Sequence, residues 1–140
     1  MSNESDNQTN VKELENIKEL RAYLAAAIFA DLPEEYAGEV DSDQIDVDSV
    51  DKASADVNAF LEKFGQRLAP LPDRTFQDGT YTSEQSAAQD LWFSRQGHGV
   101  GFWEKDRQEY YGAELAQEMD EYSKSIGPIH LEVVKYIIME

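Results

Sequence analysis

Hydrophobic residues in the first half of the chain recur at the spacing of amphipathic helices. Over residues 11–29 apolar side chains return every three or four positions, or at multiples of these steps, while lysines and glutamates occupy the opposite side. A second stripe follows Asp48 and consists of Ala53, Val57, Phe60, Leu61, Phe64 and Leu68. The pattern predicts one helix over 11–29 and a second helix that begins at Asp48 or Ser49.

The segment Gln89–Lys105, QDLWFSRQGHGVGFWEK, alternates with a period of two instead. The alternating apolar residues are Leu91, Phe93, Val100 and Phe102. Glycines flank His98 and can adopt the positive φ angles of a tight turn. The segment is therefore predicted to form a central β-hairpin, with Trp92 and Trp103 on the face opposite the alternating residues.

The C-terminal third returns to helical spacing before ending in a β-branched run. A third helix is predicted from Asp106 to the Gly127-Pro128 pair, with an apolar line made by Tyr111, Leu115, Met119, Tyr122 and Ile126. Residues 129–139 predict a strand beside the hairpin. The predicted fold is a single α+β domain over residues 11–140, with about three helices on a small antiparallel sheet. Residues 1–10 are expected to be a disordered tail, and residues 31–50 an acidic loop.

Composition narrows the range of functions. The 140 residues include 29 acidic and 12 basic side chains, which give a formal net charge of −17. Such a charge disfavours nucleic acids and anionic membranes as partners and favours proteins with basic surfaces. The chain has no cysteine, and neither a signal peptide nor a long apolar run is apparent, so a soluble intracellular protein is expected.

Acidic residues are concentrated before and at the start of the second predicted helix. We define the acidic belt as Glu34, Glu35, Glu39, Asp41, Asp43, Asp46, Asp48 and Asp51. Carboxylates at this density can imitate the phosphates of a DNA duplex. A calcium loop is the alternative, but Ile45, Asp46 and Lys52 occupy positions where the EF-hand pattern needs other residues. No metal or cofactor is predicted, and solvation alone is the simpler explanation of the belt.

The predicted hairpin supplies the remaining candidate chemistry. Arg95 could hold an anion, although an ion pair with Glu104 across the hairpin is favoured. His98 could act as an acid, a base or a metal ligand, although a turn residue bonded to its own loop is favoured. Trp92 and Trp103 could contribute to a protein interface. No catalytic residue is predicted, because no nucleophile–base pattern occurs in the sequence.

The stretch Asp90–Trp103, DLWFSRQGHGVGFW, resembles a signature of small uncharacterised proteins encoded by tailed bacteriophages and prophages. Those proteins carry a run similar to D-F-W-L-T-R-N-G-H-G-x-G-F-W-D. Here Leu91 precedes the tryptophan, Gln96 replaces the asparagine, and Glu104 with Lys105 follows the second tryptophan. The resemblance implies a viral origin and a place in the cytoplasm of a bacterial host. It implies no catalytic residue.

These observations predict a non-enzymatic phage protein that binds a host protein with a basic surface. In a more specific version of this hypothesis, the protein imitates DNA and inhibits a host nuclease, defence complex or DNA-binding factor. The belt would supply charge, while Trp92, Arg95, His98 and Trp103 would supply shape or a second contact. One alternative is a small-ligand or enzymatic domain with its site at Arg95 and His98. Another is a virion or assembly component that associates with copies of itself.

Overall fold

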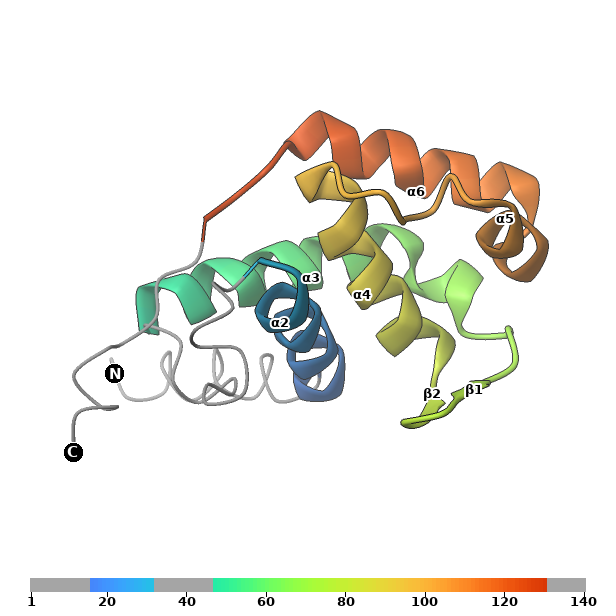
Figure 1. Cartoon of the computed structure of the whole chain (residues 1–140), viewed down its shortest axis with the longest axis horizontal. Helices are drawn as coiled ribbons and strands as arrows, with labels where there is room; N and C mark the ends of the chain where they lie inside the picture. The colour runs from blue at the N-terminus through green and yellow to red at the C-terminus, as the bar shows by residue number, and fades with distance from the viewer. Residues whose placement is uncertain (1–15, 32–46, 131–140) are drawn as a thin grey trace.

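A computed structural model describes residues 16–31 and 47–130, which form five helices and a two-stranded antiparallel sheet (Figure 1). The elements are α2 (Ile17–Asp31), α3 (Val47–Leu68), β1 (Arg74–Phe76), β2 (Gly79–Tyr81), α4 (Ser83–Gln96), α5 (Lys105–Tyr111) and α6 (Ala113–Ile126). The described part is thus mostly helical with a small sheet. This composition agrees with an α+β class, but five helices replace the three that the sequence predicts.

Helix α4 lies in the middle of the described structure. It packs against α2 on one side and α6 on the other, with α3 also in contact (Figure 1). The pairing of α2 and α4 is the most extensive contact between any two elements in this part of the chain. Small buried residues on both helices, Ala22, Ala26, Ala27, Ala87 and Ala88, favour this close packing.

Helix α3 confirms the second predicted helix. Its stripe is buried, with Ala53, Val57, Phe60, Phe64 and Leu68 all at 1% exposure or less and Leu61 packed at the edge of the core. Phe60 stacks on Phe102 from the loop after α4, and Phe64 meets the ring of Tyr122 on α6 edge-on. The period of 3.6 residues was therefore sufficient to identify both the helix and its buried face.

The third predicted helix is divided into α5 and α6. Gly112 separates them with φ 93° and ψ 139°, a conformation that other residues rarely adopt. The predicted end of this segment is confirmed, since α6 stops at Ile126 and the amide of Gly127 bonds back to the carbonyl of Ser123.

The predicted central hairpin is wrong, because residues 83–96 form helix α4. A capping box begins the helix: Gln85 N–H donates to Thr82 Oγ1 at 3.1 Å, and Thr82 N–H donates to Gln85 Oε1 at 2.8 Å. Gly97 ends it in the left-handed conformation, with φ 76°. No β-branched residue lies between Ser83 and Gln96, so local preference favours a helix over the short apolar alternation.

The only strands in the described ranges lie at the edge of the fold, before α4. Arg74 pairs with Tyr81, Thr75 with Thr80 and Phe76 with Gly79, and a two-residue turn ending in Asp78 joins the strands. Gly79, the residue after the turn, has φ 144° and begins β2. The predicted C-terminal strand lies outside the described residues from position 131 onward. Residues 1–15 and 32–46, which include the predicted tail and most of the predicted acidic loop, also lie outside them.

Candidate functional site

Polar side chains of α4 and of the loop after it join three internal hydrogen-bonded clusters. Each cluster contains at least one residue from the Asp90–Trp103 stretch, and each connects α4 or its loop to other parts of the fold. We name them by one member each: the Asp90 cluster, the Arg95 cluster and the Asp31 cluster. Together the clusters contain Asp90, Trp92, Arg95 and His98 of this stretch.

The Asp90 cluster links α4 to α5. Asp90 is 2% exposed, and Arg107 donates to its Oδ1 atom from Nε at 3.2 Å and from Nη2 at 3.0 Å. The hydroxyl of Tyr111 donates to Oδ2 at 2.8 Å. Burial raises the pKa of Asp90, and the hydrogen bonds from Arg107 oppose that shift. Both carboxylate oxygens of Asp90 accept hydrogen bonds from the protein, and the side chain is almost fully buried. Asp90 therefore stabilises the fold and is not accessible to a substrate.

The Arg95 cluster ties four segments together. From α4, Arg95 Nη1 donates to Asp56 Oδ2 on α3 at 2.7 Å and to the hydroxyl of Tyr23 on α2 at 3.0 Å. Its Nε donates to the carbonyl of Gly127, after α6, at 2.7 Å. Burial raises the pKa of Tyr23 to about 12, although the charge of Arg95 acts in the opposite direction. Arg95 is therefore a buried cross-link.

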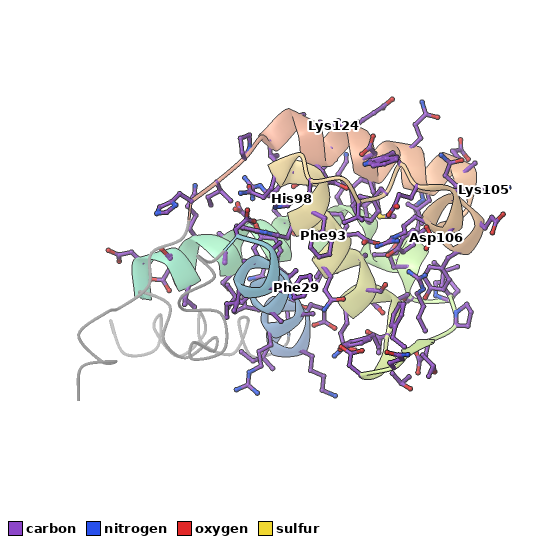
Figure 2. The ribbon with its side chains drawn as sticks, viewed as in Figure 1. Phe29, Phe93, His98, Lys105, Asp106 and Lys124 are labelled. Atoms are coloured by element: carbon purple, nitrogen blue, oxygen red, sulfur yellow. The ribbon has the colours of Figure 1, made fainter. Side chains whose placement is uncertain are left out.

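The Asp31 cluster holds the C-terminal end of α2 against α4. The buried indole of Trp92 donates from Nε1 to Asp31 Oδ2. His98 Nε2 lies 2.9 Å from Asp31 Oδ1 and 3.0 Å from Oδ2. The imidazole also meets the ring of Phe93 edge-on, and both residues lie near the C-terminal end of α4 (Figure 2). About a third of the His98 side chain is exposed, so this cluster reaches the surface.

The loop between α4 and α5 folds back onto α4. The amide of Phe102 donates to Ser94 Oγ at 3.0 Å, and the Phe102 ring enters the core. Gly101 has φ 155°, and a Cβ atom there would overlap Ser94 Oγ. Trp103, the next residue but one, is 46% exposed. Gly101 and Phe102, at the end of the GHGVGF string, are thus packed closely on α4, whereas Gly99 and Val100 are exposed.

The structure separates the four residues assigned to the predicted hairpin surface. Trp92 and Arg95 are buried, whereas His98 and Trp103 are partly exposed. The favoured ion pair between Arg95 and Glu104 is wrong, because Arg95 pairs with Asp56 and Glu104 pairs with Arg107. His98 bonds to α2, and not to its own loop as expected. Arg95 and His98 belong to different clusters, so the geometry does not give a shared ligand site.

Sequence reasoning missed the partners in these clusters. Asp31, Asp56 and Arg107 lie 61, 39 and 17 residues from the α4 side chains that they bind. No local spacing connects them. The one local signal was the capping box at Thr82 and Gln85 followed by Gly97, which predicts a helix between them but not its buried polar partners.

Two residues of the acidic belt, Asp48 and Asp51, belong to the described part of the chain. Glu34, Glu35, Glu39, Asp41, Asp43 and Asp46 lie outside the described residues. Asp48 and Asp51 lie on exposed positions in the first turns of α3. Negative charge there suits the positive end of a helix. The binding role assigned to the belt therefore stays a prediction.

Comparison with known proteins gives no relative, because no protein-family model, curated protein or solved structure matches this chain. Within residues 16–31 and 47–130, no three histidine, aspartate or glutamate side chains are grouped to hold a metal ion. No helix in the same ranges is both long and apolar enough to cross a membrane.

Proposed function

We propose that this chain is a phage-encoded, non-enzymatic protein that binds a basic protein in the cytoplasm of a bacterial host. Its acidic surface would imitate the phosphates of DNA and inhibit a nuclease, a defence complex or a DNA-binding factor. The proposal rests on the net charge of −17. The ion pairs that the described lysines and arginines form within the protein support it.

The charges are distributed unevenly along the chain. Residues 16–31 and 47–130 contain 17 of the 29 acidic residues but 10 of the 12 basic ones. The segment 32–46 contains six acidic residues and no lysine or arginine. A partner that recognises phosphate-like charge would find the highest density of carboxylates in this segment and in the α3 residues Asp48 and Asp51 that follow it.

Five of the ten described lysines and arginines form ion pairs with other described residues. The ion pairs are Arg67–Glu118, Arg74–Asp106, Arg95–Asp56, Arg107–Asp90 and Lys124–Asp120. These cations cannot neutralise other acidic side chains without breaking contacts between or within elements. The excess of negative charge is therefore available for long-range attraction of a basic partner, which would accelerate association at low salt.

The Asp90–Trp103 stretch supports a scaffold role more than a catalytic one. Its charged and aromatic members Asp90, Trp92, Arg95 and Phe102 are buried, and their polar groups are bonded within the protein. A catalytic group needs access to a substrate in addition to a tuned environment. We therefore assign partner recognition to the charged surface.

The test is affinity capture of the tagged protein from a bacterial lysate at low and high salt, followed by direct binding to the captured protein. Lysine replacement of Asp41, Asp43, Asp46 and Asp48 should weaken binding more than tenfold, because charge attraction is replaced by repulsion. The matched control replaces Glu62, Glu109, Glu114 and Glu121 with lysine and changes the net charge equally.

If the belt is the contact surface, the control variant should retain clearly more affinity than the belt variant. A DNA duplex should compete with the wild-type protein for the captured target. Binding that is insensitive to salt, or that both variants retain unchanged, would contradict the proposal.

A further inference from the structure

A groove of about 420 Å³ opens where the start of α2, the second half of α3 and the start of α4 meet. We propose that this groove receives a lysine side chain of a basic partner protein. The inference rests on the proposed function and gives it a defined contact point. The lining residues are Asn16, Glu19, Leu61, Gly65, Gln66, Ala69 and Glu84.

The groove combines an apolar surface with two carboxylates. Leu61, Gly65 and Ala69 come from α3 and its end, whereas Glu19 and Glu84 come from α2 and α4. Both glutamates are partly buried. Neither forms an ion pair with a cation within residues 16–31 and 47–130, and Glu84 accepts a hydrogen bond from Ser83 Oγ at 3.0 Å. An aliphatic chain that ends in a positive charge matches both features.

Gly65 leaves part of the groove surface without a side chain. It is the one glycine inside a helix among the described residues, and glycine disfavours a helix interior relative to alanine. The fold does not require it: an added Cβ would meet only Leu61 Cβ, at an ordinary distance of 3.9 Å. The missing side chain keeps the surface of the groove open at some expense of helix stability.

The arrangement of acceptors favours an ammonium group over a guanidinium group. Glu19 and Glu84 project from separate helices, and Asn16 and Gln66 add amide groups to the lining. A guanidinium group is best matched by one carboxylate that faces it in a plane. An ammonium group is a compact charge with three donors that can be directed to separate acceptors.

The probe is N-acetyl-lysine methylamide, titrated into the full chain labelled with ¹⁵N and followed by NMR. Saturable shifts are expected at the amides of Glu19, Gly65, Gln66 and Ala69. The norleucine analogue, which lacks the charge, should give no saturable shifts, and the arginine analogue should bind more weakly. The Glu19→Gln/Glu84→Gln variant should lose affinity roughly tenfold or more, whereas Glu109→Gln should bind as wild type does.

Gly65→Ala separates folding from binding. The midpoint of thermal unfolding should rise, because alanine favours the helix, while affinity for the lysine probe should fall. The affinity of Gly65→Leu for the lysine probe should be lower still. Shifts that are spread over all acidic surfaces without saturation, or Gly65→Ala and Gly65→Leu variants with unchanged affinity, would overturn the inference.

The same variants distinguish this inference from the proposed function. A captured basic protein that binds wild type and Glu19→Gln/Glu84→Gln equally would overturn the groove assignment and leave the proposed function standing. Saturable lysine binding in the groove, together with salt-insensitive protein capture, would support the groove and overturn DNA mimicry.

Discussion

Helices α3 and α4 both enter the core, but they do so with opposite kinds of side chain. Helix α3 buries a continuous apolar stripe and keeps most of its charges on the surface. Helix α4 buries Leu91 and Trp92 together with five polar residues, Ser83, Ser86, Asp90, Ser94 and Arg95. The comparison shows that a helix can bury several polar side chains beside a short apolar stripe, here Ala87, Ala88, Leu91 and Trp92, provided that each buried polar group finds a partner.

The two helices should therefore respond differently to substitution. The contribution of α3 depends on buried apolar area, which is not directional, so another apolar residue retains much of it. The contribution of α4 depends on hydrogen bonds with defined partners and geometry. Removing one partner leaves the other buried and unsatisfied.

The largest effect is expected for Asp90→Ala, which should lower the free energy of unfolding by about 2–4 kcal/mol, because Tyr111 loses a buried acceptor and Arg107 keeps only its more exposed partners Glu104 and Asp106. Urea denaturation measures this change. On α3, Phe60→Leu should cost only about 1–2 kcal/mol. The double variant Asp90→Leu/Arg107→Met should recover much of the loss by removing both charges. If Asp90→Ala costs less than Phe60→Leu, the proposed difference between the helices is wrong.

A smaller effect is expected where the return loop packs on α4. Gly101→Ala should cost about 1–3 kcal/mol, since the new Cβ would overlap Ser94 Oγ at an unfavourable φ. Gly112→Ala is the matched control, because its φ is also positive but no atom lies within 4 Å of the added Cβ. In thermal unfolding, Gly112→Ala should lower the stability less than Gly101→Ala does. Equal costs would mean that backbone strain alone determines the result.

The smallest effect concerns pH and the Arg95 cluster. The pKa of Tyr23 is raised to about 12 in the folded protein, so the neutral phenol contributes stability that is complete below about pH 10 and is lost as pH rises through 12. The free energy of unfolding should fall in that window, with a Tyr23 contribution of at most about 1.4 kcal/mol per pH unit.

Tyr23→Phe should make this alkaline slope shallower, although other buried tyrosines keep it above zero. Absorbance titration of the phenolate should show the loss of one high-pKa group in the variant. The same slope in both proteins would contradict the assignment. The ring contact of Tyr23 with Trp92 is retained by phenylalanine, so packing changes little.

The contrast between α3 and α4 also explains what the sequence could predict. The stripe of α3 and the end of α6 at Gly127 depend on local spacing, and both were predicted correctly. The sequence does not identify α4, because the alternation of Leu91 and Phe93 also fits a strand and serine, aspartate and arginine share its buried positions with apolar residues. The division at Gly112 depends on one backbone angle. The three clusters depend on contacts between distant segments, which periodicity does not encode.

The two tryptophans of the chain provide separate optical reporters. Trp92 is 1% exposed and bonded to Asp31, whereas Trp103 is 46% exposed. Fluorescence of a Trp103→Phe variant would come from the buried indole alone and would report on the integrity of the α2–α4 contact. The difference between wild-type and variant emission would isolate the surface indole. Intrinsic fluorescence can therefore distinguish unfolding from events at the surface without an added label.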